Sequence, residues 1–242
     1  MSELYLQLFD AIKKGRLVAV ATVIAGPAVG SKLLMRPDGQ QLGQLGSPEL
    51  DELAHGPILE QLASGQSGRF TLTLAGEKIE LFVDVYAPPP KLIIVGAVHI
   101  AIPLVTFAKA LGFYTIVLDA RSGFATPERF QHADQLIIQW PADALPTLGL
   151  DESTCIVVLT HDEKLDNPAL AVAVQSPARY IGALGSKKTH QRRFAALHEL
   201  GVSDEQIARI HAPIGIEIGA RRPEEIAVAI IAEIVAVVNG VR

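Results

Sequence analysis

Three consecutive prolines, Pro88 to Pro90, constrain the fold of this chain more than any other feature. Proline has no backbone N–H to donate to a sheet and its φ angle is fixed, so a run of prolines forms an extended, rather stiff connector. The sequence also changes rhythm here, from short extended segments to alternating strand and helix patterns. We therefore predict a small domain over 1–86, a linker over 87–90 and a second domain over 91–242.

The segment before the prolines predicts an α+β domain. Ser47 is followed by Pro48 and acidic residues, which is a typical helix start because serine caps free N–H groups and proline fits the first turn. The turn at Ala75-Gly76-Glu77 separates two segments that alternate like the strands of a hairpin. We expect helices at Leu4–Lys14 and Ser47–Ser64, and strands at Leu17–Ile24, Lys32–Met35, Arg69–Leu74 and Ile79–Val85.

After the prolines, apolar runs alternate with helical patterns. Continuously apolar strands with helices between them are typical of a parallel sheet that is covered by helices on both faces. The fold class we predict is therefore α/β, with a Rossmann-like parallel sheet in the second domain. The expected strands are Leu92–Val95, Thr115–Leu118, Gln135–Ile138, Cys155–Leu159, Arg179–Ile181 and one near Ile210; the expected helices are Ile102–Leu111, Pro127–Phe130, Asn167–Val174, Lys187–Leu200, Asp204–Ala208 and Pro223–Val238.

Composition narrows the class of protein. The chain has 242 residues, of which 49% are hydrophobic, and its net charge of −5 without a basic stripe argues against a nucleic-acid partner. The single cysteine, Cys155, cannot form an internal disulfide and is expected to be an inert core thiol. No signal-peptide pattern is evident, and the apolar run Ile226–Val238 is too short to span a bilayer and contains Glu233. We expect a soluble cytoplasmic protein with no membrane partner.

Glycines and polar residues gather after the predicted strands. In a doubly wound sheet, ligands bind in the crevice beyond the carboxyl ends of the strands. We therefore expect a bound cofactor to contact Gly96, Val98, His99, Asp119, Arg121, Thr160, His161, Gly182, Gly185, Ser186, Lys187, Lys188, Pro213 and Gly215. His99 and Asp162 are the candidate catalytic acid or base groups, although Asp162 fits the role of a helix cap equally well.

The loop GAVHIA, from Gly96 to Ala101, is similar to the glycine-rich turn that binds dinucleotides. Gly96 permits the sharp turn, and the following helix directs free N–H groups at an anion. In the dinucleotide fingerprint a second glycine lets the backbone approach the pyrophosphate, and Val98 occupies that place. Asp119 suits a ribose hydroxyl, whereas Arg121 suits a further phosphate. Three readings stay open: a dinucleotide site, a site for another anion, or a turn without a ligand.

A second loop, GALGSKK from Gly182 to Lys188, suits phosphate because glycines, a cap serine and two lysines meet at a helix start. It lacks the residue order of a Walker motif, and the alternative is a capped helix with solvated lysines. No two of the histidines at His99, His161 and His211 have the short spacing of metal ligands, so no metal site is predicted.

The motifs GAVHIA, LDAR, LTHD, YIGALGSKKTHQRR and IHAPIGIEIGARRPEEIAVAIIAEIVA occur in order between Leu92 and Asn239. With them the chain resembles the C-terminal Rossmann-like domain of the XdhC/CoxI family, accessory proteins of molybdenum hydroxylases such as xanthine dehydrogenase and carbon monoxide dehydrogenase. The resemblance implies a chaperone rather than a catalyst, which binds molybdenum cofactor (molybdopterin) and supports its sulfuration and insertion. It implies as partners an apo molybdenum hydroxylase, a cysteine desulfurase and a second copy of the chain in a homodimer.

The first domain is less similar to the family. AGPAVGSKLLM keeps Gly30 and Lys32 but lacks the family's Pro-Arg pair, and LGQLGSPELDE has Gly43 and Gly46 but no cysteine. These departures bear on the chaperone activity more than on the fold. Two other functions stay open: an NAD(P)-dependent oxidoreductase, and a dimer that senses a nucleotide without catalysis.

Overall fold

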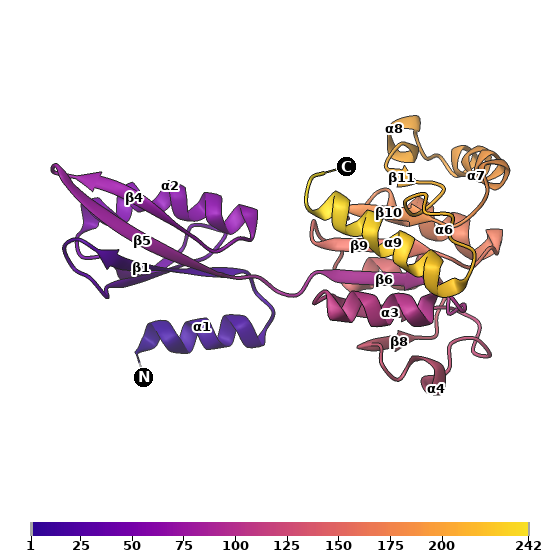
Figure 1. Cartoon of the computed structure of the whole chain (residues 1–242), viewed down its shortest axis with the longest axis horizontal. Helices are drawn as coiled ribbons and strands as arrows, with labels where there is room; N and C mark the ends of the chain where they lie inside the picture. The colour runs from indigo at the N-terminus through magenta and orange to yellow at the C-terminus, as the bar shows by residue number, and fades with distance from the viewer. Residues whose placement is uncertain (1, 242) are drawn as a thin grey trace. The chain divides into compact units, whose positions relative to one another are not determined.

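A computed structural model describes residues 2–241 of the chain (Figure 1). The chain forms two compact units, Met1–Pro89 and Pro90–Arg242, which meet in the run of prolines. Each hydrophobic core cluster draws its residues from one unit only. Each unit therefore buries its own apolar side chains.

The N-terminal unit is a five-stranded antiparallel sheet, in the order β3-β2-β1-β5-β4, with a helix on each face (Figure 1). Its elements are α1 (Glu3–Lys13), β1 (Val18–Ala25), β2 (Lys32–Met35), β3 (Gln41–Gln44), α2 (Pro48–Ser64), β4 (Gly68–Leu74) and β5 (Glu77–Tyr86). Side chains alternate along a strand, so Ala19 and Ala21 of β1 pack in the core under α2, whereas Val18 and Val20 pack with α1.

The predicted elements of this unit are present, with ends that differ by at most two residues. Ser47 caps α2 as predicted, because its Oγ accepts a hydrogen bond from the Leu50 N–H at 3.2 Å. Strand β3 is not predicted by the sequence, since Gly43 in its centre is typical of a loop. A Cβ at Gly43 would collide with the Lys32 carbonyl of β2, so glycine allows β3 to pair there.

The C-terminal unit is a six-stranded parallel sheet in the order β11-β10-β9-β6-β7-β8, so the predicted Rossmann-like α/β fold is confirmed. The strands are β6 (Lys91–Val95), β7 (Tyr114–Leu118), β8 (Gln135–Ile137), β9 (Thr154–Val158), β10 (Tyr180–Ala183) and β11 (Ile210–His211). The helices are α3 (Ala101–Ala110), α4 (Pro127–Phe130), α5 (Pro141–Ala144), α6 (Glu163–Ala173), α7 (Lys187–Glu199), α8 (Asp204–Ile207) and α9 (Pro223–Val238), with a 3₁₀ turn η1 (Leu145–Leu148) after α5.

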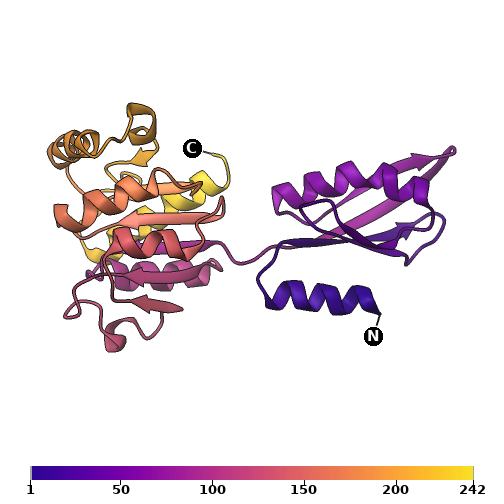
Figure 2. The ribbon, with the colours of Figure 1, turned by 180° about the vertical axis from the view of Figure 1, so that it is seen from behind.

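Helices cover both faces of this sheet. One core cluster joins α3 and α9 to one face, and a second joins α5, α6 and α7 to the other (Figures 1 and 2). Helix α6 begins at Glu163, earlier than the sequence predicts, because Asp162 caps it and Pro168 lies inside the helix rather than at its start. No helix among residues 2–241 is long and apolar enough to cross a membrane.

The chain reverses direction once as it builds the sheet. From the central strand β6 it moves outward through β7 to β8, then returns to β9 on the other side of β6 and continues to β11. All neighbouring strands are parallel, so their carboxyl ends lie at one edge of the sheet. The reversal between β6 and β9 is the topological switch point, where open α/β sheets form their ligand crevice.

Candidate functional site at the switch point

The loops that follow β6 and β9 lie side by side at the switch point. The Gly96 N–H donates to the Leu118 carbonyl at 2.9 Å, and the Leu159 N–H donates to the Val95 carbonyl at 2.8 Å, which extends the sheet to the loops. Gly96 has a φ of 115°, and a Cβ there would lie 2.7 Å from Thr160 Cγ2. Glycine is therefore required at 96 for the two loops to pack, independently of any ligand.

Val98 and His99 form the turn before α3. The Val98 side chain is half-buried and packs against the core cluster that holds α3 and α9. His99 is exposed in the same turn, just ahead of Ala101 where α3 begins. The side chain in the place of the second fingerprint glycine thus belongs to the packing of the fold, whereas His99 is accessible to a ligand.

Asp119 is fully buried after β7 and holds two loops together. Its carboxylate accepts hydrogen bonds from the Ala97 N–H at 2.8 Å, the Arg121 N–H at 2.9 Å and the Arg121 guanidinium at 2.8 and 3.0 Å. Burial by itself raises the pKa of Asp119, but the hydrogen bonds from Arg121 and Ala97 together hold it below its ordinary value. The Arg121 guanidinium also lies 4.3 Å from the centre of the Phe124 ring. A ribose hydroxyl would have to displace one of these donors from Asp119.

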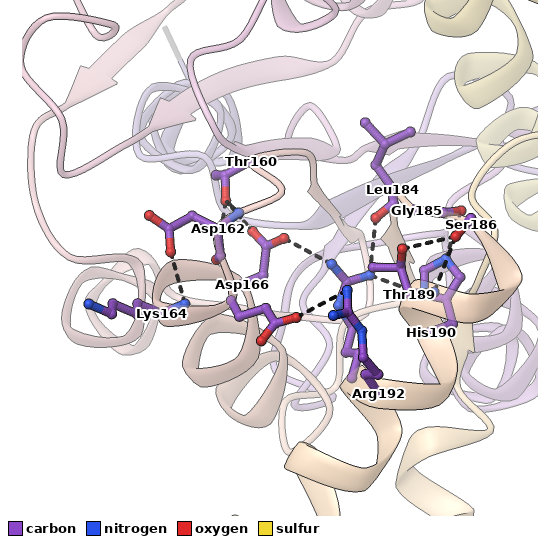
Figure 3. Close-up of polar contacts among 12 residues, drawn as sticks. Thr160, Asp162, Lys164, Asp166, Leu184, Gly185, Ser186, Thr189, His190 and Arg192 are labelled. Atoms are coloured by element: carbon purple, nitrogen blue, oxygen red, sulfur yellow. Dashed lines mark hydrogen bonds and ion pairs between the residues drawn. The ribbon is translucent and has the colours of Figure 1, made fainter.

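The loop after β9 buries the Thr160 side chain and exposes that of His161. Figure 3 shows the polar contacts of Thr160. The Thr160 hydroxyl donates to Asp166 Oδ1 at 2.5 Å and accepts from the Asp162 N–H at 3.0 Å. Asp162 in turn caps α6 by accepting from the Lys164 N–H at 3.0 Å. His161 is exposed and has a φ of 62°, a conformation that few residues other than glycine adopt. Of this loop, His161 is the side chain that a ligand reaches most freely.

The loop after β10 leads into an electropositive helix start. Ser186 caps α7, since its Oγ accepts from the Thr189 N–H at 3.2 Å. Lys187 and Lys188 follow in the first turn, where both are exposed and no acidic residue accompanies them. Cations at the positive end of a helix dipole are unfavourable unless an anion is present. Gly185, with a φ of 154°, precedes the cap.

A buried ion pair lies under these two loops, between α6 and α7 (Figure 3). Arg193 Nη2 donates to Asp166 Oδ2 at 2.9 Å, and Arg193 Nη1 donates to the Leu184 carbonyl at 3.0 Å. His190 Nδ1 lies 3.0 Å from Arg193 Nη1, and His190 Nε2 lies 3.1 Å from the Gly185 carbonyl. Burial raises the pKa of Asp166, and the Thr160 hydroxyl and the Arg193 charge oppose that rise.

A second buried carboxylate, Glu233 of α9, holds the loop after β11. It accepts hydrogen bonds from the Tyr180 hydroxyl at 2.6 Å and the Gly215 N–H at 2.7 Å, and it lies 3.6 Å from His211 Nδ1. Burial raises its pKa, but His211, Tyr180 and Gly215 together lower it to about 2. Gly182 serves the same packing, because a Cβ there would lie 2.7 Å from the Tyr180 hydroxyl.

The structure divides the predicted residues by accessibility. Exposed are His99, His161, Ser186, Lys187, Lys188 and Pro213; partly buried are Val98, Arg121, Asp162, Gly185 and Gly215; buried are Gly96, Asp119, Thr160 and Gly182. Sequence reasoning missed the buried side chains beneath the crevice: Asp166, Tyr180, His190, Arg193 and Glu233. One signal points to Glu233, since a carboxylate inside the apolar run of α9 is tolerated only with partners.

Two further observations bear on where the site lies. Among residues 2–241, no three His, Cys, Asp or Glu side chains are placed to hold a metal ion. A surface cavity of about 460 Å³ in the N-terminal unit is lined by none of the predicted residues, and its Arg36 and Asp10 already pair with Gln7 and Lys14. The candidate site is placed by the strand order alone, at the loops that follow the parallel strands, where folds of this class form their ligand crevice.

The parallel sheet and its strand order define the C-terminal unit as a Rossmann-type domain. Residues 92–234 match the family model described as the XdhC Rossmann domain, and residues 11–74 match the model of the XdhC and CoxI family. The chain belongs to the XdhC and CoxI family.

Several known proteins are similar to this chain. YqeB of Escherichia coli K12 is 28% identical over 88% of this chain and 41% of its own length. A Bacillus subtilis 168 protein described as a probable xanthine dehydrogenase subunit is 34% identical over 64% of this chain and 45% of its own. The E. coli K12 "Molybdenum cofactor insertion chaperone PaoD" is 39% identical over 40% of this chain and 30% of its own. The chain thus spans less than half the length of these curated relatives.

A solved structure shares the fold. The crystal structure of a protein described as a xanthine dehydrogenase from Bacillus halodurans aligns with all of this chain and 97% of its own, with a TM-score of 0.59. The two sequences are 22% identical, so this likeness concerns the fold alone.

Proposed function

We propose that this chain binds molybdenum cofactor in the switch-point crevice and delivers it to an apo molybdenum hydroxylase of the xanthine dehydrogenase or carbon monoxide dehydrogenase type. The observation that carries the proposal is the family match over residues 92–234, which includes every loop of the crevice. The name of PaoD, a molybdenum cofactor insertion chaperone, supports the same role.

The exposed residues of the crevice fit an anionic, phosphate-bearing ligand. Lys187 and Lys188 bring positive charge to the Ser186-capped start of α7, where free N–H groups also favour an anion. His99 and His161 are exposed and supply further polar contacts. When bound, the cofactor would supply the molybdenum centre that the hydroxylase uses. The residues of this chain would bind and orient it, and none need act as a catalyst.

The alternative, an NAD(P)-dependent oxidoreductase, has one observation in its favour. The strand order of the C-terminal unit is the one found in dinucleotide-binding domains. Two side chains disfavour it. Val98 fills the place of the glycine that admits the pyrophosphate, and the Asp119 carboxylate is fully engaged by Ala97 and Arg121.

The proposal extends to sulfuration of the bound cofactor and to a homodimer, as the family resemblance implies. Cys155 does not serve as a sulfur carrier in this scheme. It is buried in β9, and burial raises the pKa of its thiol to about 12, so the reactive thiolate is scarce at neutral pH. A cysteine desulfurase partner would therefore provide the sulfur.

Calorimetry tests the proposal. The purified chain is titrated with molybdenum cofactor and, separately, with NAD(H) and NADP(H). We expect stoichiometric cofactor binding, weakened about tenfold or more when Lys187 and Lys188 are both replaced by Gln, because two charge-assisted contacts are lost. Replacement by Gln of the exposed Lys13 and Lys14, at the C-terminal end of α1, is the matched control and should leave the affinity for the cofactor unchanged.

Stoichiometric dinucleotide binding without cofactor binding would overturn this function in favour of the alternative. The Val98→Gly variant tests whether this side chain is what prevents dinucleotide binding. If the valine excludes a pyrophosphate, this variant should gain dinucleotide affinity that the natural chain lacks.

A further inference from the structure

The Asp166–Arg193 pair is buried almost completely, with side chains 1% and 2% exposed. Neither residue can touch a ligand in the crevice without rearrangement. A buried ion pair is weak evidence for stability, because the free energy of desolvating two charges offsets much of their attraction. Stability alone therefore does not explain the pair, and its hydrogen bonds indicate what else it does.

A continuous series of contacts runs from the loop after β6 to the loop after β10. Gly96 leaves room for the Thr160 methyl group, and the Thr160 hydroxyl donates to Asp166. Asp166 accepts from Arg193, and Arg193 donates to the Leu184 carbonyl. The buried guanidinium thus joins the loop after β10 to Asp166 and, through Thr160, to the loop after β9, against which the loop after β6 packs.

The geometry requires arginine at the centre of this series. The planar fork places Nη2 on Asp166 of α6 and Nη1 on the Leu184 carbonyl in the loop after β10. His190 adds a third contact. Because its Nε2 faces the Gly185 carbonyl, Nε2 carries the proton and donates, so Nδ1 is free to accept from Arg193. Burial, followed by the Arg193 charge, lowers the pKa of His190 and favours this neutral ring.

We propose that Asp166 and Arg193 are positioning residues of the crevice. They fix the loop 160–162 relative to the loop 184–186, so that His161 and the start of α7 are held at one separation. The ligand named here rests on the function proposed above, but the positioning role does not. Loss of the pair should loosen these two loops and weaken ligand binding while the sheet stays folded.

The chain offers a matched control. Arg192 is adjacent to Arg193 on α7 and pairs with Glu163 of α6 at 3.6 Å, but these side chains are 67% and 56% exposed. Both arginines thus join the same two helices, one in the interior and one at the surface. Arg192→Met should change neither loop motion nor binding, since exposed ion pairs contribute little.

Backbone hydrogen exchange tests the proposal without any ligand. In Arg193→Lys the charge on Asp166 stays paired, but one ammonium cannot hold both loops in the fork geometry. We expect amide exchange in 160–162 and 184–186 to rise about tenfold or more, while amides of β6 and β9 keep their protection. Equal rises in loops and strands would mean a purely structural role and would overturn the proposal. Unchanged amide exchange in 160–162 and 184–186 would overturn the proposal as well.

Binding of molybdenum cofactor provides the second readout. Arg193→Lys should weaken binding about tenfold with little change in unfolding midpoint, and Asp166→Asn combined with Arg193→Met should behave similarly without leaving one charge unpaired. If a variant with faster exchange in 160–162 and 184–186 kept the cofactor affinity of the natural chain, the proposed effect of loop positioning on binding would be wrong. If the natural chain binds no cofactor, the proposed function fails, whereas the exchange result still decides the positioning role.

Discussion

At the residue scale, three buried carboxylates hold the loops of the candidate site in place. Asp119 joins the loops after β6 and β7, Asp166 joins those after β9 and β10 through Arg193, and Glu233 holds the loop after β11. A buried carboxylate is tolerated only when donors surround it, so each one fixes the backbone groups that it contacts. The polar residues of the crevice therefore divide into those that build it and those that are free to meet a ligand.

Gly96→Ala should destabilise the C-terminal unit by about 3 kcal/mol, because an alanine at positive φ is strained and its Cβ would collide with Thr160. Gly112→Ala is the matched control. Gly112 has a φ of 83° but open space around it, so only the backbone strain of about 1 kcal/mol should remain. Urea denaturation followed by Trp140 fluorescence measures the free energy of unfolding of both variants. Equal losses of stability in the two variants would contradict the tight packing of the loops after β6 and β9.

At the element scale, helix α9 has two tasks. Its apolar side chains pack against α3 and the sheet, while Glu233 extends from the same helix to Tyr180 and the Gly215 N–H. The pKa of Glu233 is lowered from 4.5 to about 2. Because the pKa in the folded protein lies below that in the unfolded chain, the carboxylate stabilises the fold above pH 4.5. That stabilisation is lost as the pH falls toward 2.

Glu233→Gln should therefore lower the free energy of unfolding at pH 7 by about 2 kcal/mol, since the amide keeps the shape but not the charge. The difference in free energy of unfolding between the natural chain and the variant should decrease by about 1 kcal/mol when the pH is lowered from 7 to 4. Urea denaturation at both pH values is the measurement, with the exposed Glu199→Gln of α7 as control. A gap that stays constant or widens on acidification would contradict the lowered pKa.

At the scale of the whole molecule, the two units are separate in their cores. The clusters under α1 and α2 contain no residue of the C-terminal unit, and those around the parallel sheet contain none of the N-terminal unit. The prolines between them cannot extend either sheet through backbone N–H groups. We therefore expect the free energy of unfolding of each unit to depend on its own core and not on the other unit.

Residues 90–242, expressed alone, should fold and unfold with a midpoint within a few degrees of that of the full chain, because its core is complete. Residues 1–89, which lack tryptophan, should fold alone as judged by circular dichroism. The Trp140 signal reports the C-terminal unit in both settings. A segment that stays unfolded alone would show that its unit depends on contacts with the other.

Much of the fold is predicted by the sequence because strand and helix periods are local. The apolar runs from Leu92 onward predict the parallel sheet, and Ser47 predicts its own helix cap. Strand β3 is not predicted from local pattern, because glycine is needed at position 43 only where the backbone passes close to the Lys32 carbonyl of β2. That contact joins different strands, so no local pattern reveals it.

The candidate site divides in the same way. The residue pattern is enough to predict which loops begin at the carboxyl ends of the strands, and Gly96, His161 and Lys187 follow three of those strands. Which polar groups are accessible becomes known from the folded chain alone, since Asp119 and Thr160 have hydrogen-bond partners inside the fold. The physical reason is that a buried charge is stabilised by whichever donors folding brings to it, and these come from distant parts of the chain.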